Sequence, residues 1–230
     1  SVLIRSDDVR TGQGLGILAD NGDVMNITGI SSSYALTFEE VEAALLRYQK
    51  AKYFLCGFEV RPSLVLPAAE KAKALGMQTM LNPSPVPSEG LAPVPYIDYL
   101  FVNEVEALQL LNRKIKREFD VKEACEALLE RYQCGCVVMT LGDLGSAYLR
   151  AGGDYRTFDT IPVQSVDSAG AGDGYMAAVA ARLCRGDSLA EACAYASVFA
   201  AYSVTKKDCL PGYATPKQLQ AFLDARQPKA

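Results

Sequence analysis

The chain has 230 residues, of which 50% are hydrophobic and 22% are charged, with a net charge of −4. This composition is typical of a globular protein. The acidic balance argues against a nucleic-acid-binding protein, which normally carries a basic face. No apolar run approaches the roughly 18 residues that a membrane helix needs. We therefore expect a cytoplasmic protein without nucleic-acid or membrane partners. The sequence does not begin with Met, and it opens in the middle of a secondary-structure pattern. We therefore expect that an N-terminal segment precedes it.

The chemistry available to the chain is limited by its residue types. There is no histidine, which excludes serine–histidine–aspartate triads and histidine-ligated zinc. The seven cysteines are odd in number and scattered, as expected for reduced thiols. Cys134-Gly-Cys136 is the only close pair, and it is a weak metal motif. Catalysis would have to use carboxylates, basic side chains, backbone amides or a bound ion.

The first predicted elements form a hairpin. A glycine-rich strand over 12–19, a turn at 20–23 and a returning strand over 24–30 lie outside the pattern that follows. We expect this hairpin to be a flap, so that residues 1–30 belong to a lid and residues 31–230 form an α/β domain.

The remainder alternates between strands and helices, which predicts a mostly parallel sheet with helices on both faces. The expected strands are 53–56 (buried), 77–81, 99–102, 137–141, and an antiparallel pair at 146–149 and 155–158. The expected helices are 37–50, 63–75, one from 103, 121–133, 170–185, 188–204 and 216–225.

The most informative segment is a small-residue turn, Asp167-Ser-Ala-Gly170-Ala171-Gly172-Asp173, which leads into an apolar helix. Backbone amides at a helix N-terminus attract anions, and small residues let a phosphate approach closely. A carboxylate at Asp173 is unfavourable in such a site, and a proton-accepting role would explain it. The alternative is that Asp173 only complements the helix dipole.

Two further motifs follow predicted strands. Asn103 and Glu106 lie one helical turn apart, so both side chains can face one site; the alternative is a helix cap. Thr140-Leu-Gly142-Asp-Leu-Gly145 forms a strand-end turn. The carboxyl ends of strands are where open α/β sheets bind ligands.

In their order along the chain, these motifs resemble the signatures of the ribokinase-like (phosphofructokinase-B) carbohydrate kinases. The segment Asn82-Pro83-Ser84-Pro85 is similar to the Asn-Pro-Ala-Pro segment of ribokinases, and Thr11-Gly12 with Asp20-Asn21-Gly22 is similar to the β lid of the family. The resemblance implies a ribokinase-like α/β fold with a small protruding β lid. It implies transfer of the γ-phosphoryl group of ATP to a hydroxyl of a sugar or related small polyol, with Mg²⁺.

The resemblance also implies roles for single residues. Asp173 matches the general base, which also contacts the substrate. Independently of the resemblance, the apolar edge of the hairpin over 12–30 is expected to be covered, so the hairpin covers the acceptor site, pairs two subunits as a homodimer through the lid, or does both. The remaining matches are Gly170, Ala171 and Gly172 as the anion hole; Thr140, Gly142 and Gly145 at the nucleotide; Asn103 and Glu106 at the nucleotide and, through water, Mg²⁺; Glu59 at the sugar; and Asp167 with the Ala169 carbonyl at a monovalent cation, K⁺.

The chain departs from the family at two places. Ribokinases continue the cation loop with a Gly-Ala pair where this chain has Asp208-Cys209, which leaves potassium dependence open. The early strand and the Gly-Gly sugar motif have no counterpart, which leaves the acceptor open. A nucleoside kinase of the same family and a non-catalytic nucleotide-binding regulatory protein remain alternatives. A dehydrogenase is disfavoured because no Gly-x-Gly-x-x-Gly follows a first strand.

Overall fold

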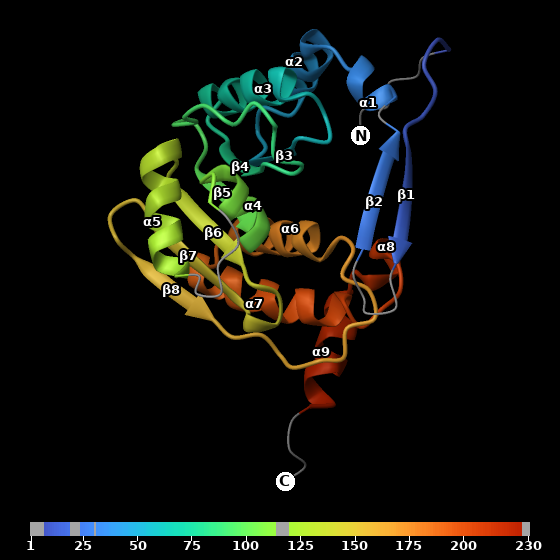
Figure 1. Cartoon of the computed structure of the whole chain (residues 1–230), viewed down its shortest axis with the longest axis vertical. Helices are drawn as coiled ribbons and strands as arrows, with labels where there is room; N and C mark the ends of the chain where they lie inside the picture. The colour runs from blue at the N-terminus through green and yellow to red at the C-terminus, as the bar shows by residue number, and fades with distance from the viewer. Residues whose placement is uncertain (1–6, 19–23, 30, 114–119, 227–230) are drawn as a thin grey trace. The chain divides into compact units, whose positions relative to one another are not determined.

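The structure, a computed structural model, describes residues 7–18, 24–29, 31–113 and 120–226 (Figure 1). By compactness the chain divides into two units. The first comprises Ser1–Leu15, Ile27–Thr140 and Ala147–Arg156, and the second comprises Gly16–Asn26, Leu141–Ser146 and Thr157–Ala230. The division expected from the sequence, at residue 30, remains a prediction.

A six-stranded sheet has the order β3-β4-β5-β6-β7-β8. Its strands are β3 (Tyr53–Gly57), β4 (Gln78–Asn82), β5 (Tyr99–Asn103), β6 (Cys136–Thr140), β7 (Ser146–Arg150) and β8 (Tyr155–Phe158). The strands β3 to β6 are parallel. The Arg150 amide donates to the Asp154 carbonyl at 3.0 Å in the connection between β7 and β8. That connection is too short for a parallel crossover, so the two strands are antiparallel. All six strands were expected from the sequence.

Burial differs between the middle and the edge of this sheet. Strands β5 and β6 are almost continuously apolar and buried, and the middle of β4 is buried as well, as in parallel sheets covered on both faces. Strand β3 was also expected to be buried, but its residues are half-buried and Leu55 is 37% exposed. The expectation was wrong because β3 is an edge strand with a neighbour on one side only.

The described helices of the first unit are α1 (Ser32–Ala35), α2 (Phe38–Arg47), α3 (Pro62–Ala74), α4 (Glu104–Leu110) and α5 (Val121–Tyr132). Three of them, α2, α4 and α5, begin at a short polar residue whose side chain caps the helix. In α2, the Thr37 side chain accepts from the Glu40 amide, and the Glu40 side chain accepts from the Thr37 amide. This capping box was expected, and it fixes the start of the helix. Helices α2 and α3 enclose a core cluster that includes Leu45, Ala72 and Met77.

The second unit is mainly helical. It contains η1 (Gly142–Leu144), α6 (Ala171–Cys184), α7 (Leu189–Ser203), α8 (Cys209–Gly212) and α9 (Pro216–Asp224). Helix α6 packs along α7, and α9 covers the end of α7 through an edge-to-face contact between Tyr202 and Phe222, with ring centroids 5.4 Å apart. The Tyr175 hydroxyl donates to the Ser146 hydroxyl at 2.9 Å. The sequence predicted α6, α7 and α9 but not the short helices α8 and η1.

Strands β1 (Gln13–Leu18) and β2 (Val24–Gly29) form a separate two-stranded sheet, as expected for the lid. The turn expected at residues 20–23 lies outside the described residues. Leu15, Ile17, Met25 and Ile27 are 59%, 48%, 63% and 54% exposed. Because alternate residues of a strand share a face, each lid strand turns an apolar face to solvent.

None of the seven cysteines forms a disulfide, as the sequence predicted. Burial raises the pKa values of Cys56, Cys125 and Cys134 to about 12, whereas Cys184 is exposed. Among the described residues, no three His, Cys, Asp or Glu side chains are grouped to hold a metal ion. In the same part of the chain, no helix is long and apolar enough to cross a membrane.

Candidate functional site

The carboxyl ends of four parallel strands of the first unit lie on the same side of the sheet, which we call its carboxyl edge. Several candidate residues lie there. Gly57 is paired with Asn82 at the ends of β3 and β4, and Asn103 is paired with Thr140 at the ends of β5 and β6. Ligands of open α/β sheets bind outside the carboxyl ends of the strands. The fold therefore brings the Asn-Pro-Ser-Pro motif, the Asn-x-x-Glu motif and Thr140 to a common edge, although they are far apart in the sequence.

At this edge, Glu106 is held by two asparagines. The Asn103 amide donates to Glu106 Oε2 at 2.9 Å, and the Glu106 amide donates to Asn103 Oδ1 at 2.8 Å. This is a capping box at the start of α4, the alternative reading of the motif. Asn82 Nδ2 also donates to Glu106 Oε2, at 3.2 Å. Glu106 is half-buried, so its carboxylate is fixed while still reachable from solvent. The contribution of Asn82 was not predicted.

Glu59 lies exposed in the turn that follows β3. The turn is tied to the loop after β4, because the Phe58 amide donates to the Ser84 carbonyl at 3.0 Å. A Cβ atom on Gly57 would lie only 3.2 Å from the Asn82 carbonyl oxygen. The close approach of the two loops sets Glu59 beside the Asn-Pro-Ser-Pro segment, at the same edge as Asn103 and Thr140.

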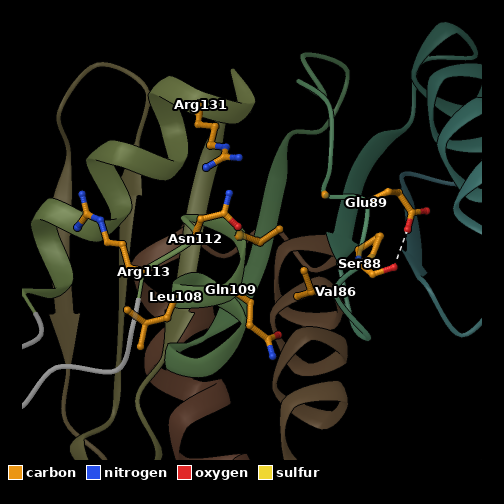
Figure 2. Close-up of a pocket in the computed structure, with 11 residues that line it drawn as sticks. Val86, Ser88, Glu89, Leu108, Gln109, Asn112, Arg113 and Arg131 are labelled. Carbon is orange, nitrogen blue, oxygen red and sulfur yellow. Dashed lines mark hydrogen bonds between the residues drawn. The ribbon is translucent and has the colours of Figure 1, made fainter.

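The first unit also contains a cavity of about 450 Å³ between the loop after β4 and the C-terminal ends of α4 and α5 (Figure 2). Its lining residues include Ser88, Glu89, Asn112 and Arg131, and none of the candidate residues is among them. We do not assign the site to this cavity, because the carboxyl ends of the strands carry the candidate groups.

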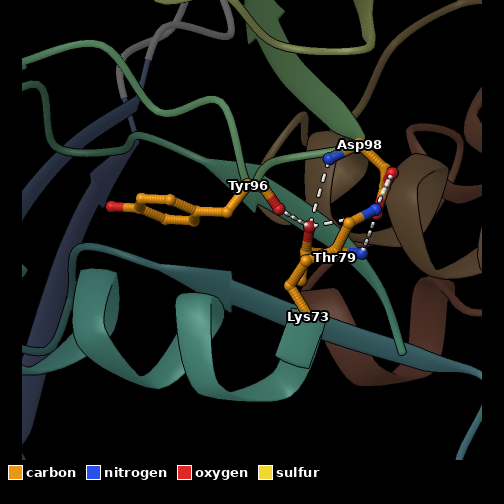
Figure 3. Close-up of polar contacts among 4 residues, drawn as sticks. All are labelled: Lys73, Thr79, Tyr96 and Asp98. Atoms are coloured by element: carbon orange, nitrogen blue, oxygen red, sulfur yellow. Dashed lines mark hydrogen bonds and ion pairs between the residues drawn. The ribbon is translucent and has the colours of Figure 1, made fainter. Parts of the chain in front are cut away.

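A second polar cluster lies at the opposite edge of the sheet, near the amino ends of β4 and β5 (Figure 3). The Asp98 carboxylate accepts from the Thr79 amide at 2.9 Å and from Lys73 Nζ at 2.5 Å. The buried Thr79 hydroxyl donates to the Tyr96 carbonyl at 2.6 Å and accepts from the Asp98 amide at 3.1 Å. These bonds satisfy the backbone where the chain enters β5, so the cluster is structural.

In the second unit, the loop at 141–145 depends on two glycines with positive φ. Gly142 has φ +59 with open space around its Cβ position. Gly145 has φ +93, and a Cβ atom there would lie 2.0 Å from the Phe158 carbonyl oxygen. The Leu141 amide donates to the Gly145 carbonyl at 2.9 Å, which closes the loop. Gly142 thus shapes an exposed backbone surface, whereas Gly145 is needed for packing.

The turn before α6 is also in the second unit. Gly170 is the N-cap of α6 in the left-handed conformation, with φ 73 and ψ 3. Asp173 lies in the first turn of the helix and is accessible to solvent. The surrounding protein nevertheless desolvates its carboxylate and raises its pKa. A carboxylate with a raised pKa at a helix N-terminus is unfavourable for folding, and it is a better proton acceptor than an ordinary aspartate.

The amides of this turn differ in what they contact. The Ala171 amide donates to the Ser168 carbonyl at 3.2 Å, and the Gly174 amide donates to the Gly170 carbonyl at 2.9 Å. Within the described part of the chain, the Gly172 amide has no acceptor. Of the three residues expected to form an anion hole, Gly172 therefore presents an open donor, and Ala171 has its donor engaged inside the turn.

The far side of the turn is covered by Tyr213, which the sequence did not predict. Its hydroxyl donates to the Gly170 carbonyl at 2.9 Å. A Cβ atom on Gly170 would lie 2.8 Å from this hydroxyl oxygen and 2.9 Å from Cys209 Sγ. Both glycine identity and the αL conformation are therefore required at position 170.

The carboxylate of Asp167 holds the entry to the turn. Its Oδ1 accepts from the Ala169 amide at 2.9 Å, and its Oδ2 accepts from the Asp208 amide at 3.0 Å. The residues expected to bind a monovalent cation, Asp167 and Ala169, are adjacent in this arrangement. Each unit thus groups part of the candidate set: the first holds Glu59, Asn103, Glu106 and Thr140, and the second holds Gly142, Gly145, Asp167, Ala169 and the turn at 170–173.

Known protein sequences are similar to this chain over most of its length. Ribokinase of Mus musculus is 31% identical over 176 residues, which are 75% of this chain and 54% of the mouse protein. Ribokinase of Staphylococcus aureus is 28% identical over 90% of this chain and 67% of its own length. Deoxyribokinase of Salmonella typhi is 24% identical over 84% of this chain and 62% of its own length. The chain thus spans between about half and two thirds of these relatives.

Solved structures share the fold. Ribokinase of Thermotoga maritima superimposes with a TM-score of 0.80 at 24% identity, over 94% of this chain and 70% of that protein. Arabidopsis thaliana ribokinase, solved with ribose and ATP, also gives a TM-score of 0.80 at 24% identity, over the same shares. This likeness confirms the expected ribokinase-like fold, a mostly parallel α/β sheet with helices.

The fold therefore places the chain among the open α/β proteins with a mostly parallel sheet. Its sequence matches the pfkB family carbohydrate kinases over residues 1–216. The chain belongs to the pfkB carbohydrate kinase family, as its motifs indicated.

Proposed function

We propose that this protein takes part in ATP-dependent phosphorylation of a sugar or related small polyol. The observation that carries the proposal is the turn before α6. It combines a solvent-accessible carboxylate of raised pKa, Asp173, with the open Gly172 amide at a helix N-terminus. Family membership supports the same reaction class.

In the proposed reaction, a hydroxyl oxygen of the acceptor attacks the γ-phosphorus of ATP. The Asp173 carboxylate takes the hydroxyl proton, the new O–P bond forms, and the bond to the β-phosphate oxygen breaks to release ADP. The open amide of Gly172, at the N-terminus of α6, stabilises charge on the transferring group. Burial raises the pKa of Asp173, which makes the carboxylate a stronger base at neutral pH.

The other candidate residues receive supporting roles. The loop at 140–145, with Gly142 exposed, suits backbone contact with the nucleotide. Glu106, fixed by Asn82 and Asn103, suits an outer-sphere role at Mg²⁺, which would neutralise phosphate charge. Glu59 is an exposed carboxylate that suits a sugar hydroxyl. Asp167 and Ala169 would flank a monovalent cation such as K⁺.

The proposal is tested by incubating the protein with Mg-ATP and a panel of acceptors while ADP is measured. D-ribose and 2-deoxy-D-ribose come first, because the relatives include ribokinases and a deoxyribokinase; fructose and adenosine follow. Acceptor-dependent ADP release that disappears in Asp173→Asn supports the proposal. Phosphorylation of adenosine alone would favour the nucleoside kinase alternative. ATP binding without any turnover would favour a regulatory nucleotide-binding protein.

We further propose that the apolar lid faces pair two copies of the chain. Exposed hydrophobic strand surfaces are normally covered, and Leu15, Ile17, Met25 and Ile27 are about half exposed or more. Light scattering should give a dimer for the unmodified chain and a monomer for Ile17→Asp. If the unmodified chain stays monomeric at high concentration, the proposed pairing of two copies through the lid is contradicted.

A further inference from the structure

The Tyr213 side chain contacts two points of the turn before α6. Its hydroxyl donates to the Gly170 carbonyl at 2.9 Å, and the same carbonyl accepts from the Gly174 amide at 2.9 Å. Gly170 adopts the left-handed conformation that starts the helix. The carbonyl is therefore held from two directions, once by the helix itself and once by a side chain 43 residues away.

The ring of Tyr213 lies against the first turn of α6, beside Gly174. A Cβ atom on Gly174 would lie 2.9 Å from Cε1 of Tyr213 and 3.0 Å from Cε1 of Phe199. The ring centroids of Tyr213 and Phe199 are 5.9 Å apart. The absence of a side chain at Gly174 is what allows both rings to lie against the first turn of α6.

The hydroxyl stays a donor under all ordinary conditions. Burial raises the pKa of Tyr213, and the nearby negative charge of Asp173 raises it further. A phenol whose pKa exceeds the usual value of about 10 is protonated throughout the neutral range. The hydroxyl therefore keeps the proton with which it donates to Gly170 in the pH range where Asp173 is charged, which is the state that a general base requires.

We propose that Tyr213 is a positioning residue for phosphoryl transfer. Its hydroxyl locks the Gly170 peptide, and its ring supports the first turn of α6. Together they keep the Gly172 amide and the Asp173 carboxylate in a fixed mutual arrangement as charge develops on the transferring group. The inference rests on the proposed kinase function. Preorganised donors of this kind act mainly on the transition state, so the effect should appear in kcat rather than in substrate binding.

The test removes only the hydroxyl, by Tyr213→Phe in the full chain. We expect kcat to fall about 10-fold, while KM for ATP and for the acceptor stays within about twofold. The affinity for Mg-ADP with aluminium fluoride, which resembles the transferring phosphoryl group, should fall by the same factor as kcat. Hydrogen exchange at the Gly174 amide should become faster, because its acceptor carbonyl is no longer held.

Tyr132→Phe is the matched control. The Tyr132 hydroxyl also donates to a backbone carbonyl at 2.9 Å, that of Leu110, but in the first unit. It should lose stability without a change in kcat. Gly174→Ala is a second variant, because it displaces the rings and leaves the hydroxyl chemically intact. It should lower kcat as well. If Tyr213→Phe does not fold, a normal kcat in Gly174→Ala contradicts the inference.

The inference is overturned if Tyr213→Phe and Tyr132→Phe have equal kcat values, or if KM rises by as much as kcat falls. The experiment also distinguishes a failure of the Tyr213 role from a failure of the kinase function. If the unmodified protein phosphorylates none of the acceptors, the proposed function fails. Exchange at the Gly174 amide then still decides whether Tyr213 holds the turn: unchanged exchange in Tyr213→Phe overturns that part, and faster exchange supports it.

Discussion

Asp167 accepts a hydrogen bond from the backbone amide of Asp208 at 3.0 Å, across 41 residues of sequence. Asp208 meets this carboxylate in an unusual conformation, with φ +67 and ψ 150. That region of φ/ψ space is nearly exclusive to glycine and costs other residues about 1–3 kcal/mol. The strain lies at the position where ribokinases carry glycine.

We predict that Asp208→Gly stabilises the fold by roughly 0.5–1 kcal/mol, because glycine relieves the strain and retains the amide that donates to Asp167. Asp208→Ala is the control, since it also removes the carboxylate but leaves the strain in place. Chemical denaturation compares the two. Equal stabilities of the two variants would show that the backbone conformation is not the cause.

Repeating the kinase assay in K⁺ and in Na⁺ tests whether the departure at Asp208 has abolished cation dependence.

Asp173→Asn should lower kcat by about 10²–10⁴-fold, the usual contribution of a general base. In the unmodified enzyme, kcat should fall as the pH drops through the raised pKa of Asp173, because the base becomes protonated. Steady-state kinetics across the pH range measure both effects. Near-normal turnover in a folded Asp173→Asn variant would remove this residue from the mechanism.

The same substitution has an opposite consequence for stability. The pKa of Asp173 is raised above its ordinary value of 3.8 by burial, so the folded state binds this proton more tightly than the unfolded state. The free energy of unfolding therefore decreases as the pH rises from 3.8 through the raised pKa. Asp173→Asn should be more stable than the unmodified chain at neutral pH, with the difference vanishing in acid. A dipole-complementing aspartate would make the variant less stable instead.

Two glycines of one loop should respond differently to alanine. At Gly142 the only cost is the positive φ, about 1–2 kcal/mol. At Gly145 the added Cβ would also overlap the Phe158 carbonyl oxygen, so we expect a loss of roughly 3 kcal/mol or more. Thermal unfolding ranks the variants, and calorimetry with ATP tests Gly142→Val, which should weaken binding in a folded protein. Unchanged ATP affinity would contradict the assignment of this loop to the nucleotide.

The cluster at the amino ends of β4 and β5 should affect stability only. Thr79→Val removes the hydroxyl that bonds the Tyr96 carbonyl and the Asp98 amide. Because these partners are partly buried, leaving them unpaired should cost about 1 kcal/mol each, the lower end of the usual range. Thr79→Ser keeps the hydroxyl and should lose far less. Because the cluster lies at the edge of the sheet away from Asn103 and Thr140, kcat should be the same in both variants, and a kcat loss in Thr79→Val alone would show that the cluster reaches the site.

The sequence predicted those elements and site residues that depend only on patterns within a short stretch of chain. The Thr37–Glu40 box and the strand at 99–102 follow from spacing and apolarity within a few residues. The Gly170 turn was recognised because glycine and the carboxylate of Asp173 are contiguous. What escaped prediction depends on residues that only the fold brings together. The contact of Tyr213 with Gly170 spans 43 residues, and no periodicity encodes it.

The expectation that β3 is a buried strand was wrong for the same reason. The residues of β3 are as apolar as those of β5, so composition could not show that β3 has one neighbour and that Leu55 is partly exposed. For Asn103 and Glu106, the sequence left the cap and the metal role as alternatives. The structure has the cap, and a capped carboxylate can still orient a hydrated ion, so the two interpretations are compatible.

The uneven exposure of the thiols gives the molecule a natural labelling position. Most of the cysteine thiols are buried or half-buried, and three of them have pKa values raised to about 12. Such thiols react slowly because the thiolate is the reactive species. Cys184 is exposed and ends the helix that begins beside Gly170, about 20 Å away along its axis at 1.5 Å per residue. A maleimide dye should therefore attach there first, without any engineered residue, and its fluorescence would follow changes in α6 as nucleotide is added.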